Sequence, residues 1–281
     1  MPLATKRASP SKAIVGTISG PPNTGKTSLA STFLKPYLLR TEGEEVPSDM
    51  PDARRPISPD IIDNEDVFWA QMNDLRKEDH DFKTLIIDSI GGLDEIFARS
   101  VIGDAGSLAK AAGGYGAGYE AVAAKHGLVR KAADVLRRER GMSTIFIGHS
   151  DIIRIEPPDA DPYTSYSLRL HKKSLRHYVD SVDLVGFIKQ EVLVKDAVKG
   201  KGDQRSQPGK AITTGDRVLV TYLTPANVSK NRMGIAEDLP FGFGENPIYR
   251  FLREKAAAEK KAAAKVVMED EGEAGEPEGE E

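Results

Sequence analysis

The chain has 281 residues, of which 39% are hydrophobic and 29% charged, a composition typical of a soluble globular protein. This length fits one large or two small domains and can bury a core without disulfide bonds or structural metal. The absence of cysteine excludes disulfide frameworks, thiol catalysis and cysteine-ligated metal sites, and the five histidines show no metal-site spacing. No apolar run approaches the ~18 residues of a membrane span, and residues 1–12 lack the apolar core of a secretory signal. We therefore expect a cytoplasmic protein without a membrane partner.

The net charge of −4 hides an asymmetry along the chain. Residues 269–281 carry eight acids and no base, which leaves a net charge of +4 on the rest. We expect a flexible basic segment over 1–12, a helix rich in alanine, lysine and glutamate over 246–268, and a disordered acidic tail over 269–281. A basic body with an acidic tail suits a protein that meets a polyanion, although the tail could equally serve solubility.

The first half of the chain alternates short apolar runs with helical patterns. Strands are predicted over 13–19, 37–39, 84–88 and 144–148, and helices over 25–33, 63–75 and 120–140. Either Asp63 or Asn64 is placed to cap the second helix, and the segments 44–59 and 103–118 are predicted loops. This alternation predicts an α/β fold with a mainly parallel sheet flanked by helices.

The second half reads differently, with strand-like stretches over 165–170, 184–188 and 217–223 and little helix before residue 246. We interpret these stretches as an antiparallel extension of the same sheet. Residues 13–245 would then form one domain.

The first strand leads into a complete GxxxxGK[ST] phosphate-binding loop. Its residues are Gly20, Pro21, Pro22, Asn23, Thr24, Gly25, Lys26 and Thr27, followed by Ser28. Backbone N–H groups of such a loop surround a β-phosphate, and the motif lies between a predicted strand and a predicted helix, as it should. Lys26 would reach the β- and γ-phosphate oxygens, and the Thr27 hydroxyl would bind Mg²⁺. The motif therefore predicts ATP and Mg²⁺ as ligands of a P-loop NTPase core.

A second motif is an aspartate at the end of a predicted buried strand. Residues 84–88 read Thr-Leu-Ile-Ile-Asp, so Asp88 ends a strand on the edge where a parallel sheet binds its ligand. There Asp88 would help to hold Mg²⁺, as a Walker B carboxylate does. Taken alone, it could also be an aspartate that caps the next turn.

The stretch IIDSIGGL, residues 86–93, resembles the strand-plus-serine signature of RecA-type recombination ATPases. Arg40-Thr41-Glu42-Gly43 is similar to a segment of RecA and RadA relatives whose glutamate activates the attacking water. This resemblance implies that Glu42 is the general base. Glu44 and Glu45 are neighbouring candidates, and all three could simply be solvated loop residues.

Two further segments agree with this resemblance. Residues 144–150 (TIFIGHS) are similar to the strand whose terminal Gln or His senses the γ-phosphate, which implies that role for His149. Residues 229–232 (SKNR) are similar to a segment that RecA-like subunits insert into a neighbour's ATP site, which implies that Lys230 and Arg232 act in trans. Without the resemblance, the histidine could be merely hydrogen-bonded and the basic pair an exposed turn.

Together these motifs resemble small, phage-type RecA/RadA-like single-strand annealing ATPases with an AAA-style phosphate loop. The resemblance implies an ATPase that binds single-stranded DNA and promotes annealing or homologous recombination, as a homo-oligomeric ring or filament with ATP between subunits. It also implies a phage or prophage origin, and a single-strand-binding protein or an exonuclease as partner.

Three segments are candidates for contact with DNA, because lysine, arginine and tyrosine supply charge and stacking. They are residues 103–119 with Lys110, Tyr115 and Tyr119, residues 151–165 with Arg154 and Tyr163, and residues 195–210 with five basic residues. Each could instead be an ordinary surface loop. Two other functions stay open: a P-loop enzyme acting on a small molecule, and a nucleotide-gated loader that acts on a partner protein without binding DNA.

Overall fold

A computed structural model describes residues 13–194 and 211–273 of the chain. The predicted segment 1–12, the basic loop 195–210 and residues 274–281 of the acidic tail lie outside the described residues. The chain divides into two units between Glu245 and Asn246. In the second unit, helix α6 spans Pro247–Glu273.

The first unit is built on a central sheet, whose strand order in the described residues is β2-β3-β4-β1-β6-β7-β9, with β5 paired to β4 and β8 paired to β6. The strands β1 to β5 are Val15–Gly20, Pro36–Arg40, Thr84–Asp88, Ser143–Ile155 and Tyr163–Leu168. The strands β6 to β9 are Leu184–Val194, Ala211–Val220, Lys230–Asn231 and Leu239–Phe241. Strands β2, β3, β4, β1 and β6 run parallel, whereas β5, β7, β8 and β9 pair antiparallel to their neighbours. The predicted α/β fold with an antiparallel extension is confirmed.

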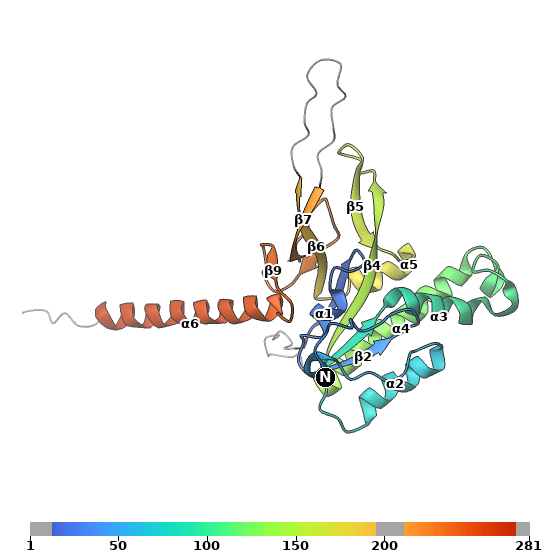
Figure 1. The fold of residues 1–281 in the computed structure, drawn as a ribbon, viewed down its shortest axis with the longest axis horizontal. Helices are drawn as coiled ribbons and strands as arrows, with labels where there is room; N and C mark the ends of the chain where they lie inside the picture. The colour runs from blue at the N-terminus through green and yellow to red at the C-terminus, as the bar shows by residue number, and fades with distance from the viewer. Residues whose placement is uncertain (1–12, 195–210, 274–281) are drawn as a thin grey trace, which may run out of the picture. The chain divides into compact units, whose positions relative to one another are not determined.

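Helices of the first unit pack on this sheet (Figure 1). They are α1 (Lys26–Ala30), α2 (Glu65–Lys77), α3 (Ile90–Ile102), α4 (Ala117–Arg140) and α5 (Lys172–Val179), with short 3₁₀ turns η1 (Asp52–Arg54), η2 (Gly103–Ala105) and η3 (Ala111–Gly113). Apolar residues of α2, α3 and α4 form one buried cluster with Val15, Leu85 and Phe146 of the sheet. On α2 the buried Phe68, Met72 and Leu75 recur at helical spacing.

The N-cap of α2 is Asn64 rather than Asp63. The Asn64 side-chain oxygen accepts a hydrogen bond from the Val67 N–H at 2.9 Å, which satisfies one of the free N–H groups at the start of the helix. Asp63 instead accepts a hydrogen bond from the Asn64 amide.

The sequence did not predict α3 or α5. Helix α3 contains the pair Gly91 and Gly92, which lowers helix propensity, but buried Leu93 and Phe97 place it in the core. Gly92 has a packing role there, because a methyl group on it would lie 2.1 Å from the Thr41 hydroxyl oxygen. Helix α5 has only eight residues, half of them basic, and its burial rests on Ser174 and Tyr178.

Several predicted boundaries were also wrong. Strand β4 continues past residue 148 to Ile155 and pairs with β5 as a hairpin, so the segment 151–165 is not the loop that the sequence predicted. The predicted loop 103–118 contains η2, η3 and the start of α4, and β7 ends at Val220 rather than at 223. Helix α6 includes residues 269–273, because glutamate favours helix.

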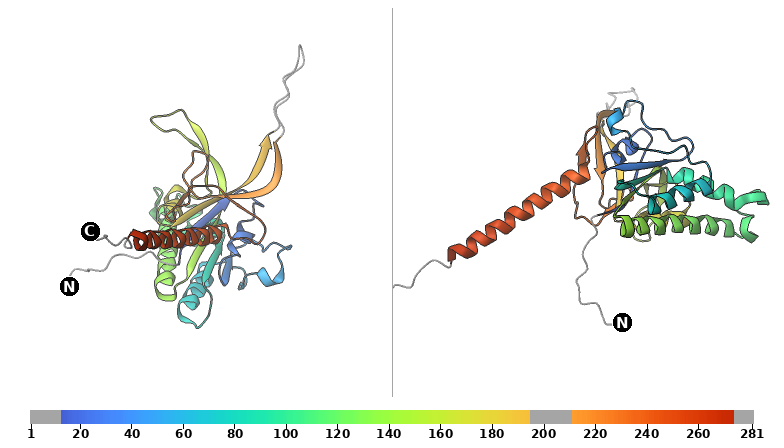
Figure 2. Two further views of the ribbon diagram at one scale, coloured as in Figure 1. Left: turned by 90° about the vertical axis from the view of Figure 1, so that its left-hand side faces the viewer. Right: turned by 90° about the horizontal axis from the view of Figure 1, so that it is seen from below.

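The hairpin β4–β5 and the outer parts of β6 and β7 project from the same edge of the sheet in Figure 1, and Figure 2 shows that they diverge from one another. The loop that joins α3 to α4 lies at the far end of these two helices, away from the hairpin. Across the described ranges, no helix is both long enough and apolar enough to cross a bilayer.

Candidate nucleotide-binding site

The phosphate loop, Asp88 and His149 meet at one edge of the sheet because the parallel strands end there together. Gly20 pairs with His149 across β1 and β4, and Arg40 pairs with Asp88 across β2 and β3. Carboxyl ends of parallel strands form the ligand edge of an α/β sheet. The phosphate loop, Asp88 and His149 therefore face one space.

The phosphate loop closes over its own lysine. The Lys26 ammonium donates hydrogen bonds to the carbonyl oxygens of Pro21 at 2.9 Å and Gly20 at 3.3 Å, and Thr24 also donates to Pro21. Gly25 has φ +87°, a left-handed conformation that favours glycine. Burial lowers the pKa of Lys26, although the charges of Asp88 and Glu44 oppose this effect. An anion in the loop would further favour the charged ammonium.

The two predicted Mg²⁺ ligands are in direct contact. The Thr27 hydroxyl donates a hydrogen bond to the Asp88 carboxylate at 2.6 Å, and Asp88 is only 3% exposed. Burial raises the pKa of Asp88 to about 6, and the hydrogen bond from Thr27 only partly offsets it. A hydroxyl oxygen and a carboxylate oxygen are hard ligands that suit Mg²⁺, so the donor set fits the predicted ion. A group of three or more potential metal-binding His, Cys, Asp or Glu side chains does not occur within the described parts of the chain.

Glu44, one of the two neighbouring candidates for the base, points into the site. Its carboxylate lies 2.9 Å from Nε2 of His149, and since an ionised carboxylate can only accept, His149 donates. This hydrogen bond lowers the pKa of Glu44, with a second contribution from Ser89, against the raising effect of burial. Glu44 is therefore an ionised acceptor at neutral pH, beside Asp88 and Lys26.

The structure does not bring Glu42 into the site. Its side chain is 74% exposed, and its carboxylate lies 3.8 Å from Arg99. The Glu44 N–H bonds to the Thr41 carbonyl, and Gly43 has φ +85°, so the chain turns between the two glutamates and Glu42 points outward. Glu45 borders the site but pairs with Arg40 at 3.0 Å and is 75% exposed.

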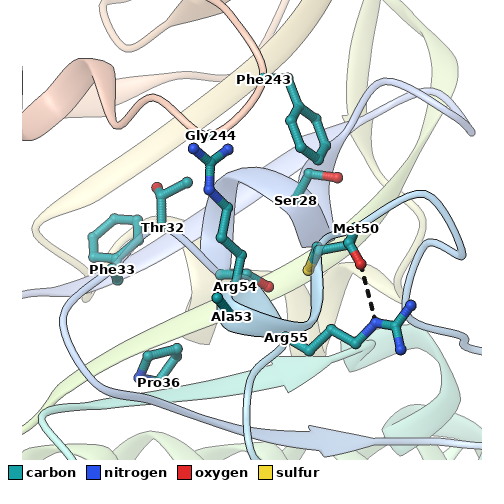
Figure 3. Close-up of a pocket in the computed structure, with 11 residues that line it drawn as sticks. Ser28, Thr32, Phe33, Pro36, Met50, Ala53, Arg54, Arg55, Phe243 and Gly244 are labelled. Atoms are coloured by element: carbon teal, nitrogen blue, oxygen red, sulfur yellow. Dashed lines mark hydrogen bonds between the residues drawn. The ribbon is translucent and has the colours of Figure 1, made fainter.

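These side chains line a pocket of about 200 Å³. Its lining residues are Pro22, Asn23, Gly25, Lys26, Thr27, Ser28, Glu44, Glu45, Pro47, Asp88 and His149. A larger pocket of about 320 Å³ adjoins it, because Ser28 lines both. Figure 3 shows Thr32 and Phe33 at the left of this larger pocket, Ser28 and Phe243 at its upper right, and Arg54 between the two pairs.

Arg54 and Phe243 lie close together in the larger pocket, with the guanidinium carbon 5.7 Å from the centre of the ring. Both groups are flat, and both stack on aromatic molecules. This pocket could not be predicted from the sequence, because its two walls come from opposite ends of the first unit.

Lys230 and Arg232 lie at the opposite edge of the sheet. Lys230 pairs with Val185 near the start of β6, and that start runs beside the start of β1. The Lys230 ammonium donates to the Asp180 carbonyl at 2.6 Å, and the largely exposed Arg232 pairs with Asp183 at 3.2 Å. Both cations are thus remote from the phosphate loop of their own chain.

A family model described as an AAA domain matches residues 12–233. The chain belongs to this AAA domain family. The matched range spans most of the chain and includes the phosphate loop, Glu44, Asp88 and His149. The match supports a P-loop ATPase. No curated protein matches the chain.

The buried Asp88 gives the AAA domain a pH-dependent stability. Its pKa is about 6 in the folded protein, against about 3.9 when unfolded, so the folded state binds more protons between these values. The free energy of unfolding must therefore fall as pH rises through this window. Above pH 6 it stays lower, because the buried Asp88 is then ionised. We predict that Asp88→Asn gains about 2 kcal/mol of stability relative to wild type between pH 4.5 and pH 7.5, at 1.36 kcal/mol per pKa unit.

Urea denaturation of both proteins at the two pH values measures this difference. Glu42→Gln, an exposed neutralisation, is the matched control and should track wild type. A difference between Asp88→Asn and wild type that is independent of pH would contradict the assignment.

Proposed function

We propose that this AAA domain hydrolyses ATP and uses the bound nucleotide to control binding of single-stranded DNA, promoting annealing in homologous recombination. The observation that carries the proposal is the Glu44–His149 hydrogen bond. It lies where the nucleotide pocket meets β4, and β4 continues without interruption into the projecting hairpin. The motif resemblance to phage RecA/RadA-like annealing ATPases supports the same function, and implies action in a bacterial host's cytoplasm.

The two adjoining pockets fit the two halves of ATP. Lys26 would bind the β- and γ-phosphates, and Ser28 marks the passage from the phosphate pocket to the larger one. We place the nucleoside in the larger pocket, where Arg54 and Phe243 offer stacking surfaces. Mg²⁺, bound through Thr27 and Asp88, would offset the negative charge of the phosphates.

Glu44 is the residue best placed to accept a proton from the attacking water. It is ionised, it lines the phosphate pocket, and it shares this pocket with Asp88 and Lys26. His149 donates to it, and the same N–H could donate to a γ-phosphate oxygen instead. Exchange of one acceptor for the other would signal the presence of the γ-phosphate to β4.

We predict that Glu44→Gln lowers the rate of ATP hydrolysis by roughly 10²- to 10⁴-fold, the contribution typical of a general base. Glu42→Gln should change the rate less than about twofold, because its side chain points to solvent. Phosphate release assays at saturating Mg·ATP measure both rates, and fluorescent-nucleotide binding shows that each variant still binds. The opposite order of effects would restore Glu42 as the base.

The β4–β5 hairpin is the element that we assign to DNA. Its exposed side chains include Ile152, Arg154 and Tyr163, and a tyrosine ring can stack on any base. Arg154 forms an ion pair with Glu156 at 2.8 Å. The tip also carries Asp159 and Asp161, so stacking rather than dense positive charge would dominate the contact.

Helix α5 follows the hairpin and supplies positive charge beside it. It carries Lys172, Lys173 and Arg176, of which Lys173 pairs with Glu120. These cations can neutralise phosphates of a DNA strand that extends past the hairpin. The other predicted DNA segment within the described residues, 103–119, exposes Lys110 and Tyr115 on the α3–α4 loop. Its last residue, Tyr119, stacks on His171 at the start of α5.

We predict that Tyr163→Ala weakens nucleotide-dependent binding of single-stranded DNA about 5- to 100-fold, the loss expected for one stacked base. Tyr115→Ala is the matched control, since Tyr115 is fully exposed but belongs to the α3–α4 loop and not to the hairpin. Fluorescence anisotropy of a labelled oligonucleotide, with Mg²⁺ and a non-hydrolysable ATP analogue, measures both. A loss with Tyr115→Ala alone would contradict the assignment to the hairpin.

The placement of Lys230 and Arg232 favours an assembly in which subunits share ATP sites. Within one chain these cations lie at the edge opposite the phosphate loop. A ring or filament could bring them to a neighbour's γ-phosphate, where they would stabilise charge in the transition state.

We predict that Lys26→Ala and Arg232→Ala are each inactive alone and regain part of the ATPase activity when mixed. In mixed oligomers, the intact Arg232 of the first variant would complete the intact phosphate loop of the second. The readout is ATP hydrolysis of the mixture, with co-purification of differently tagged subunits to establish assembly. Co-assembly without any gain in activity would show that Arg232 does not act in trans.

A second candidate function is the loading or assembly of a protein partner, such as a single-strand-binding protein or an exonuclease. The observation in its favour is that Ile152 and Ile153 are 64% and 40% exposed on the projecting hairpin, because exposed apolar side chains often mark protein contacts. If wild type binds Mg·ATP but no oligonucleotide at low salt, this function replaces DNA binding.

A further inference from the structure

Arg217, which no sequence motif marks, reaches the phosphate loop from β7. Its backbone pairs with Gln190 of β6 and with Phe241 of β9. A methyl group built on Gly25 would lie 2.8 Å from Nη1 and 3.1 Å from Cζ of Arg217. The guanidinium therefore rests against the loop residue that precedes Lys26.

The charge of Arg217 has no carboxylate partner within ion-pair distance among the residues that the structure describes. The Arg217 side chain is half-buried. The loop residue that it contacts, Gly25, is followed in the sequence by a second cation, Lys26. An anion bound at the loop would be attracted by both cations. Arginine also offers a planar set of donors that matches the oxygens of a phosphate group.

The order of the strands shows from which side Arg217 approaches the phosphate loop. Strand β7 lies beyond β6, on the side of β1 away from β3 and β4, which carry Asp88 and His149. Phe243, which lines the larger pocket, follows Phe241, the partner of Arg217 in β9. Arg217 thus lies beside the phosphate loop at Gly25, on the side of the loop away from Asp88 and His149.

We propose that Arg217 binds the α- and β-phosphates of the nucleotide, as a cation supplied by the same chain. This inference rests on the proposed placement of ATP in the two pockets. Together with Lys26, Arg217 would hold the phosphate chain from two sides. Because Arg217 belongs to β7, the bound nucleotide would also restrain the base of the β6–β7 extension.

The test compares three ligands, each with Mg²⁺: ATP, ADP and inorganic triphosphate. Arg217→Gln should weaken binding of all three by about tenfold or more, the effect expected when a charged hydrogen bond is lost. Arg217→Lys should recover part of that affinity, because the charge remains. Phe243→Ala, the contrasting variant, should weaken ATP and ADP but leave inorganic triphosphate unchanged. Isothermal titration calorimetry measures all of these affinities.

Two results would overturn the proposal. If Arg217→Gln binds all three ligands within twofold of wild type, Arg217 does not contact phosphate, and a lower melting temperature of the ligand-free variant would show that it braces the loop. A loss confined to ATP would move the contact to the γ-phosphate. Failure of the nucleotide site itself is distinguishable, because wild type and Lys26→Ala would then bind ATP equally poorly.

Discussion

The hydroxyl of Thr27 donates to the carboxylate of Asp88 where the phosphate loop meets the central sheet. The Asp88 carboxylate is almost fully buried, and burial raises its pKa to about 6. The hydrogen bond from Thr27 therefore offsets only part of the free-energy cost of burying the charge. A cation bound there would relieve the remaining cost. The contact therefore ties the position of the phosphate loop to β3, and through β3 to its neighbour β4. The other site residues line the pocket around this carboxylate.

Two routes lead from this site to the projecting edge of the sheet. One begins at His149, which pairs with Gly20 of the loop and belongs to the strand that becomes the β4–β5 hairpin. The other begins at Arg217, which rests on Gly25 and belongs to β7. Strand β4 is continuous from the nucleotide edge outward, whereas the pairing of β6 with β7 is irregular next to Arg217, between Gln190 and Val192. Under the proposed function, a change in a phosphate contact would act on both strands. We propose separate roles for the two routes. Glu44 and His149 would respond to the γ-phosphate, and Arg217 would bind the α- and β-phosphates.

The phosphate loop and Asp88 could be predicted because each depends on residues adjacent in the sequence, a short apolar strand followed by a fixed spacing. The choice between Glu42 and Glu44 could not, since it depends on the left-handed turn at Gly43 and on which side chain that turn sends inward. Helix α3 was missed because packing overrides the low propensity of its glycine pair. Arg217 gave no signal, because its contact with the loop exists only after β7 is placed beside β6.

NMR of the imidazole groups can establish whether the Glu44–His149 pair responds to the γ-phosphate. The protein has five histidines, so His149→Gln identifies the signal of interest by its loss. A non-hydrolysable ATP analogue with Mg²⁺ should shift the His149 resonances strongly, and ADP with Mg²⁺ at saturation should shift them little. Equal shifts with both nucleotides, or none with either, would contradict the proposed role of the pair.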